Sequence, residues 1–166
     1  MRLLALDIST NVGWAMFKSP TSAPTLGTWR APIAMRGHYG RRLDGFEQWL
    51  RGKVFLLRPA VVAFESPIFV KWSSDLATNE NTIRLLISLA GICELVAFRA
   101  GVRSLEVHSQ TAKVKLAGSN RASGDQMIAA AVRRGWIVAD DHQADACAVA
   151  LVAFDHVARD HVGASA

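Results

Sequence analysis

The sequence predicts an α/β fold in which a mixed central sheet carries helices on its faces. Short strand-like segments separated by turn residues open the chain, which is typical of antiparallel strands. Helical and strand-like segments then alternate, which favours parallel strands joined by crossover helices. The strand-like segments are apolar on both faces, so a sheet built from them needs cover on both sides. With 166 residues, we expect one domain over positions 1–166.

The first half of the chain is predicted to form an antiparallel meander, a helix and a buried strand. Residues 11–13 contain the asparagine and glycine that favour a turn, so the first two strands should form a hairpin. Apolar residues recur at helical spacing before Pro59, which ends the first helix. We predict strands at 3–8, 14–17, 26–31 and 59–66, and a helix at 43–57.

Helix boundary signals are clearest in the second half of the chain. Asn79 or Asn81 can cap a long apolar helix that stops at Gly101. Ser123 and Gln126 have the spacing of a capping box. We predict helices from about 80 to 100, from 123 to 134 and from 141 to 159, and a strand at 102–107.

Composition indicates an ordinary globular protein with a polyanionic partner. The chain is 51% hydrophobic and 20% charged, which excludes disordered and fibrous classes. Its net charge of +5 favours nucleic acid as a partner, and a basic protein without such a partner is the alternative. The apolar stretch at 85–98 contains Glu94 and is short for a membrane span, so we expect a buried helix and no membrane contact. Cys93 and Cys147 are expected to be free buried thiols in a cytoplasm.

Two carboxylates stand where a buried strand ends. Asp7 and Glu65 each follow several apolar residues, and a lone buried carboxylate is costly unless a cation or a donor meets it. If the two strands are neighbours, both side chains emerge at the edge of the sheet where ligands bind in α/β folds.

The start of the last predicted helix adds further acidic residues. His142 and Asp145 are three residues apart and lie on one face of that helix. Asp141 shares a face with Asp145, and it is either a ligand or the N-cap. Packing of the apolar remainder of the helix on the sheet would bring this first turn to Asp7 and Glu65.

Carboxylates and an imidazole without cysteine favour a hard cation. Such a set suits Mg²⁺, with Mn²⁺ as a possible substitute, rather than structural zinc. Two ions about 4 Å apart would activate a water and stabilise the leaving oxygen in phosphodiester cleavage. Taken singly, His142 could be an exposed first-turn residue and Asp7 a turn former.

With these residues the chain resembles the RuvC-like Holliday junction resolvases of the RNase H-like superfamily, which include phage members. The resemblance rests on LLALDIST, AVVAFES and HQADACAVA, in that order and over most of the chain. It implies an RNase H-like fold and a homodimeric, metal-dependent endonuclease. Such an enzyme resolves four-way junctions or other branched DNA by paired symmetric cuts in the cytoplasm of a bacterium or a phage-infected host.

The resemblance also implies roles for single residues. Asp7, Glu65, His142 and Asp145 match the family's metal-binding tetrad, with two ions per active site. Lys113 resembles a basic residue that approaches the scissile phosphate and completes the catalytic set.

DNA contacts are expected from aromatic and basic residues in two segments. Phe69 and Trp72, with Lys71 between them, match an aromatic that unstacks bases at the junction centre, and filling a dimer interface is the alternative role. Lys113, Lys115 and Arg121 are expected to line the DNA path, together with Arg36, Arg41 and Arg42.

Departures from the family occur in two glycine-containing segments. Ile8 and Ser9 stand where the family often has proline and glycine, and Gly124 stands where it has a lysine that Arg121 would replace.

The helix at 82–98 is the candidate for burial between two subunits, because it is apolar nearly all round.

Three rival functions share parts of this pattern. An actin-like or sugar-kinase ATPase has a similar opening strand, but it needs two such domains. A related nuclease that processes RNA would prefer single-stranded RNA. A non-catalytic junction-binding module would not need Asp7.

Overall fold

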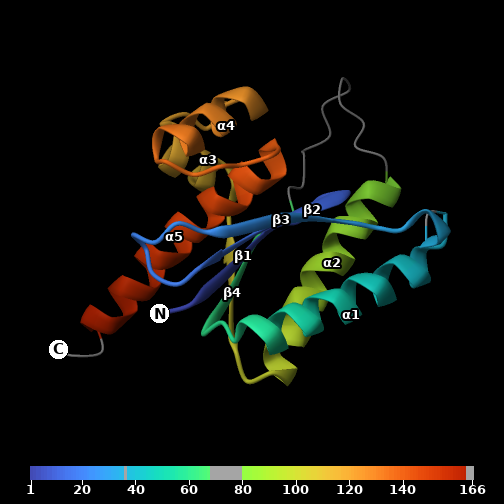
Figure 1. Ribbon diagram of the computed structural model, residues 1–166. Coiled ribbons are helices and arrows are strands. Elements are labelled where there is room, and N and C mark those ends of the chain that lie inside the picture. The colour runs from blue at the N-terminus through green and yellow to red at the C-terminus, as the bar shows by residue number, and fades with distance from the viewer. Residues whose placement is uncertain (36, 68–79, 164–166) are drawn as a thin grey trace.

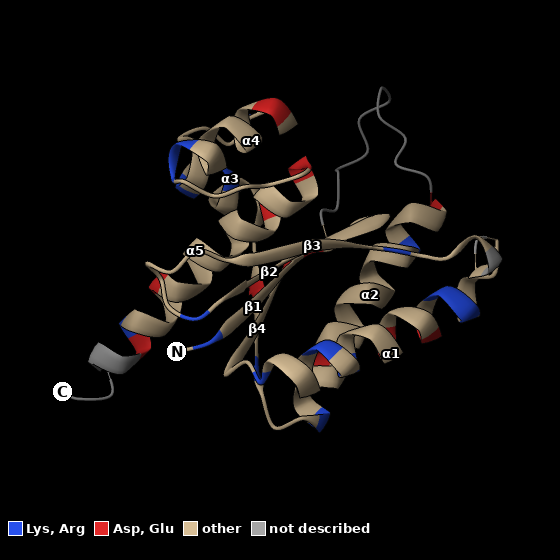
Figure 2. Ribbon diagram, viewed as in Figure 1, with Lys and Arg blue, Asp and Glu red and all other residues tan. Residues whose placement is uncertain are grey.

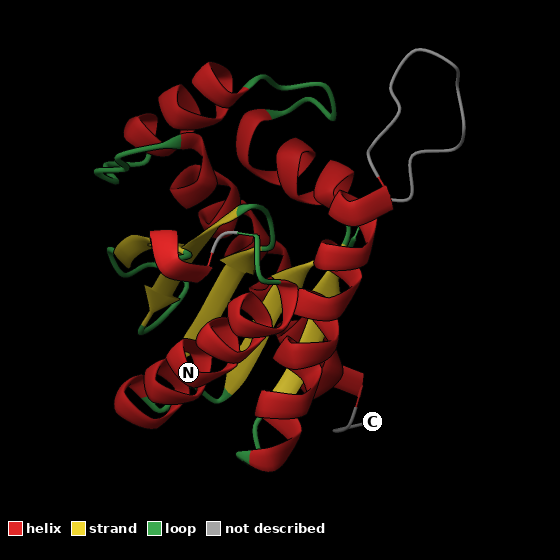
Figure 3. Ribbon diagram, turned by 90° about the vertical axis from the view of Figure 1, so that its right-hand side faces the viewer, coloured by secondary structure: helices red, strands yellow, loops and turns green. Residues whose placement is uncertain are grey.

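A computed structural model describes residues 1–35, 37–67 and 80–163. In it one sheet lies between two helical layers, with α1 and α2 on one face and α3, α4 and α5 on the other (Figures 1 and 3). The elements are β1 (Leu3–Asp7), β2 (Asn11–Phe17), β3 (Thr25–Arg30), a short 3-10 helix (Ile33–Met35), α1 (Tyr39–Leu57), β4 (Val61–Glu65), α2 (Glu80–Arg99), β5 (Arg103–Val107), α3 (Ser109–Ala117), α4 (Gly124–Arg133) and α5 (Asp141–Gly163).

The sheet is mixed, as the sequence predicts. Its strand order is β3-β2-β1-β4-β5, which places β1 in the centre. The pairs β1–β2 and β2–β3 are antiparallel, whereas β1–β4 and β4–β5 are parallel. The carboxyl ends of β1, β4 and β5 therefore meet at one edge of the sheet.

Both faces of β1 are buried, which explains its unbroken apolar run. Leu3 and Ala5 pack in the core beneath α5, and Leu4 and Leu6 pack in the core beneath α1 and α2. Five alanines of α5 are fully buried, and their small side chains let its axis approach the sheet closely. The fully buried alanines of α5 are Ala144, Ala146, Ala148, Ala150 and Ala153.

The structure departs from the sequence-based predictions at three places. Residues 11–13 belong to β2 rather than to a turn, because they pair with β3, and the bend lies at Ser9 and Thr10. Asn81 is inside α2 and is not its cap, whereas Asn79, the other predicted cap, lies outside the described residues and stays a prediction. Helix α3 is missing from the prediction, because its polar and apolar residues alternate without a clear helical period.

The long helix α2 is only half-buried. Leu85, Leu89, Cys93, Val96 and Ala97 are its buried residues. Several large apolar side chains on its other face are exposed, including Phe98 at 82%. By length and composition α2 is also apolar enough to cross a membrane, but helices that pack on a core pass the same test.

Gly13 on β2 determines how closely α5 approaches the sheet. A Cβ atom at this position would lie 2.0 Å from the backbone oxygen of His142 and 2.3 Å from its carbonyl carbon. These atoms belong to the backbone at the start of α5, so no side-chain rotation relieves the clash. The absence of a Cβ at position 13 therefore allows the helix start to reach β1.

We predict that Gly13→Ala lowers the free energy of unfolding by about 3 kcal/mol or more, because the added methyl forces α5 away from β2. Gly52→Ala is the control, since a Cβ there meets nothing within 4 Å. It should raise stability by about 0.5–1 kcal/mol through its helix propensity. Urea denaturation of both variants measures the difference, and equal stabilities would contradict this account of Gly13.

Candidate active site

Asp7 and Glu65 lie side by side at the carboxyl edge of the sheet. Leu6 of β1 pairs with Phe64 of β4, so the next residue on each strand reaches the same edge. Asp7 is only 6% exposed, and its carboxyl group forms a hydrogen bond with that of Glu65. Two carboxyl groups can share such a bond only when one of them carries a proton.

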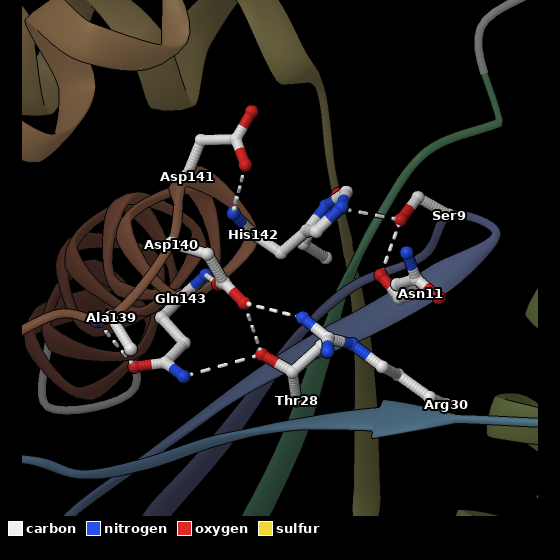
Figure 4. A network of polar contacts seen from close by, with 10 residues as sticks. Ser9, Asn11, Thr28, Arg30, Ala139, Asp140, Asp141, His142 and Gln143 are labelled. Atoms are coloured by element: carbon white, nitrogen blue, oxygen red, sulfur yellow. Dashed lines mark hydrogen bonds and ion pairs between the residues drawn. The ribbon is translucent and has the colours of Figure 1, made fainter.

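The first turn of α5 brings His142 to the same place. His142 Nδ1 lies 2.8 Å from Asp7 Oδ2 and 3.2 Å from Ser9 Oγ (Figure 4 shows the contact with Ser9). Ser9 and Asp7 thus both contact Nδ1 of His142. In the catalytic triad of a serine hydrolase, by contrast, the serine and the aspartate contact different nitrogens of the histidine ring. Among the described residues none hydrogen-bonds to Nε2, so that atom is available to a ligand.

Asp140 caps α5. Its Oδ1 accepts a hydrogen bond from the backbone N–H of Gln143 at 2.9 Å, and Thr28 Oγ1 donates to its Oδ2 at 2.8 Å (Figure 4). Arg30 lies 3.6 Å from the same carboxylate. The cap is therefore Asp140 and not Asp141, whose Oδ1 accepts only from the neighbouring N–H of His142 at 3.1 Å.

Asp145 adds a carboxylate one turn further along α5. Its Oδ1 is buried and has no hydrogen-bond partner within the described part of the chain. An unpaired buried carboxylate oxygen is expensive, and such groups deserve a specific explanation. Burial, followed by the charge of Asp7, raises the pKa of Asp145 to about 7, while the nearby ammonium of Lys113 acts in the opposite direction.

Protons compensate part of the negative charge of this cluster. Burial, followed by the charge of Asp7, raises the pKa of Glu65 to about 8. Burial also raises the pKa of Asp7, although the bond to His142 opposes it. The hydrogen bond to Asp7 raises the pKa of His142. The groups therefore hold protons that a more strongly bound cation can displace.

The donor set fits a hard divalent cation, although it does not form a closed cage. Within the described ranges, no three His, Cys, Asp or Glu side chains surround one point as ready ligands. The pairing of His142 with Asp7 turns these two side chains toward each other. The unpartnered oxygen of Asp145, and the oxygen-rich set around it, are nevertheless what a cation such as Mg²⁺ requires.

Comparison with known proteins identifies the fold. No protein-family model matches the chain, and no curated protein matches it in sequence. Thermus thermophilus RuvC is similar in structure, with a TM-score of 0.66, 20% identity and coverage of 91% of this chain and 92% of that one. The chain has the RuvC fold.

Two further solved structures share the fold. T. thermophilus RuvC in complex with a Holliday junction substrate gives a TM-score of 0.72 at 20% identity, covering 91% of each chain. The yeast mitochondrial Holliday junction resolvase Ydc2 gives 0.62 at 12% identity, covering 90% of this chain and 76% of that one. The predicted RNase H-like fold, with its mixed sheet, is thus confirmed.

The basic residues expected to contact DNA differ in their surroundings on this RuvC fold. Lys113 Nζ lies 3.3 Å from the carbonyl oxygen of Ala122 and acts electrostatically on Asp145. Lys115 Nζ lies 2.5 Å from Asp155 Oδ2, so it faces α5 in an ion pair. Arg121 is exposed. Their contacts with DNA stay predictions. Phe69, Lys71 and Trp72, like Arg36, lie outside the described residues.

Ser109 and Ser9 also touch the cluster, although neither is predicted from the sequence to belong to the site. The buried hydroxyl of Ser109 hydrogen-bonds Glu65 and favours its charged form. Ser109 follows the end of β5, the third parallel strand at this edge of the RuvC fold, and that position is a signal the sequence contains. Ser9 follows Asp7 in the bend, where its contact with His142 depends on folding.

We predict that, without divalent cations, the free energy of unfolding falls as pH rises from about 4 to 8. The folded pKa values of Glu65 (about 8) and Asp145 (about 7) exceed the ordinary values of 4.5 and 3.8. In that window the folded state holds protons that the unfolded chain has released, so raising the pH favours unfolding. The two pKa shifts taken in full correspond to a total loss on the order of 9 kcal/mol, which is an upper bound.

Denaturation in a chelator at several pH values measures this slope. Glu65→Gln should reduce the slope by about half, since the amide cannot ionise while Asp145 still does. Glu106→Gln, an exposed change on the neighbouring strand, should keep the wild-type slope. A stability that rises over this window would contradict the described charge state of the cluster.

Proposed function

We propose that the protein is a divalent-metal-dependent endonuclease that cuts branched DNA, with four-way junctions as its first candidate substrate. The supporting observation is the convergence of Asp7, Glu65, His142 and Asp145, with an unpartnered buried oxygen, at one edge of the sheet. The same fold in RuvC binds a Holliday junction substrate. A net charge of +5 suits a partner rich in phosphates.

In this proposal the four side chains hold two Mg²⁺ ions. Asp7 would be the shared ligand, Glu65 and Asp145 would each serve one ion, and His142 would either bind the second ion or orient the attacking water. The bound ions would supply the positive charge that makes water nucleophilic and stabilises the leaving oxygen in phosphodiester hydrolysis.

The protein's own groups prepare this site. Glu65 and Asp145 must lose protons before they act as ligands, so neutral or mildly alkaline pH favours loading. The hydrogen bond between His142 Nδ1 and Asp7 fixes the ring and leaves Nε2 to face a ligand. Lys113 stabilises the charged form of Asp145 and is the proposed contact to the scissile phosphate.

We propose that two copies act together as a symmetric dimer through α2. Ile87 and Leu95 are 44% and 42% exposed and Phe98 is 82% exposed, so the outer face of this helix is apolar. Gly91 lies on an open part of the helix, where a partner backbone can approach. A twofold axis would present two sites to opposing strands, as paired cleavage requires.

The remaining assignments concern the setting. We propose that residues 1–166 form one nuclease domain that works in the cytoplasm of a bacterium or a phage-infected host. The free, buried Cys93 and Cys147 are compatible with such a reducing environment. Phe69, Lys71 and Trp72 are proposed to contact the junction centre, with Lys115 and Arg121 along the DNA path.

Asp7→Asn and Glu65→Gln should each reduce cleavage in Mg²⁺ by roughly 100-fold or more while junction binding persists, because the ligands are lost and the basic surface is kept. The measurement uses labelled four-way, three-way, flap and linear DNA, and single-stranded RNA, with mapped cuts. Asp44→Asn, the same change at an exposed position of α1, should cut normally. Cleavage by Asp7→Asn at the wild-type rate would show that Asp7 is not a metal ligand of the active site.

Ile87→Glu should weaken dimerisation on the order of 100-fold, because it buries a charge in the proposed α2 interface. Sedimentation equilibrium measures the effect. Ile137→Glu changes an apolar residue that is 92% exposed outside α2, so it should leave the association unchanged. If both variants sediment like the wild type, the subunits do not meet through α2.

A further inference from the structure

A pocket of about 430 Å³ lies between the C-terminal halves of α1 and α2, far from the acidic cluster. Pro59 and Val102 contribute to its wall just before β4 and β5 begin, whereas Glu65 stands where β4 ends. Figure 1 shows both helices ending toward the same end of the sheet as the N-terminus. A molecule bound in this pocket would leave the carboxyl edge of the sheet open.

The inside of the pocket is aliphatic. Val54, Pro59 and Val96 line it and are themselves buried, so they form a fixed wall. Phe55 also lines it but is 79% exposed, which is unusual for a large apolar side chain. A volume of this size suits one or two apolar side chains of a partner, which would lose contact with water there.

Basic side chains surround this apolar interior. The pocket is lined by Arg51, Arg58 and Arg99 and by one acidic residue, Glu47, so three positive charges against one negative charge leave an excess of two. Arg51 and Arg99 both approach Glu47, at 3.8 and 3.9 Å, from largely exposed positions. Arg58 forms no ion pair within the described ranges. Figure 2 shows blue, basic segments near the ends of α1 and α2.

The backbone at Arg58 supports a role for its side chain. Arg58 has φ of 47°, and it is the one residue other than glycine with a positive φ in the described parts of the chain. Its N–H donates to the carbonyl oxygen of Val54 at 2.9 Å and closes α1. Glycine adopts this helix-ending conformation without steric cost, so an arginine at this position goes against the backbone preference.

We propose that this pocket binds a short acidic peptide segment of a partner protein, with a bulky aliphatic side chain in the pocket and carboxylates on the arginines. The inference goes beyond the proposed nuclease function and does not rest on it. An acidic segment matches the excess positive charge, and the concave aliphatic wall matches one inserted side chain. DNA bases would instead need an aromatic platform in the buried wall, where Val54, Pro59 and Val96 stand, and a membrane surface would need a convex apolar face.

Fluorescence anisotropy of a fluorescein-labelled peptide, Asp-Asp-Asp-Glu-Leu, tests the proposal on the full-length protein. We expect saturable binding that weakens with salt, and about tenfold weaker binding to Arg58→Gly. Glycine is compatible with the positive φ, so this variant removes the guanidinium while the fold is kept. Arg51→Gln should also weaken binding, whereas Arg41→Gln, an exposed arginine at the other end of α1, should not.

Other occupants give different results. A peptide with serine in place of leucine should bind at least tenfold more weakly; equal binding would mean that charge alone acts, and it would overturn the proposal. Absence of saturation near 1 mM peptide, or equal losses in Arg41→Gln and Arg58→Gly, would also overturn it. So would binding to phosphatidylglycerol vesicles or duplex DNA that depends on Arg58 when the peptide does not bind.

Discussion

The structure depends on the placement of several acidic groups in a poorly solvated corner of the sheet. Burial of one carboxylate already costs free energy, and each additional neighbour raises the cost through repulsion. Here protons on Glu65 and Asp145 and the imidazole of His142 offset that charge. Without metal, the repulsion within the cluster is limited because its carboxyl groups stay partly protonated. Divalent ions that bind there would displace these protons.

The fold creates this corner by bringing together segments that are distant in sequence. The parallel pairing of β1 with β4 fixes Asp7 beside Glu65, and it leaves little freedom because both strands are covered on both faces. The position of His142 and Asp145 depends on how closely α5 approaches β2. The absence of a side chain at Gly13 permits this close approach. Asp140 then anchors the start of that helix to Thr28 of β3. The site is therefore a property of the tertiary packing rather than of one motif.

Much of this could be predicted because buried polar residues are conspicuous in apolar segments. Asp7 and Glu65 stood out for that reason, and Ser123 with Gln126 marked a helix start that the structure confirms. Other features depend on tertiary contacts and do not follow from the local sequence. Adjacent aspartates at 140 and 141 cannot be distinguished as caps by spacing, since the choice depends on contacts with β3. Helix α3 lacks a one-sided apolar pattern, and the exposure of one face of α2 cannot be read from a helix that is apolar nearly all round.

The burial of α5 limits where such a protein can change over evolutionary time. This helix packs against β1 and β2 and against α3 and α4, and residues 146–154 in its middle are all buried, alanines among them. Substitutions there would alter the packing and displace His142 and Asp145 together. Substitutions should therefore accumulate at exposed positions on α3, α4 and the loops, while the helix that carries His142 and Asp145 diverges slowly.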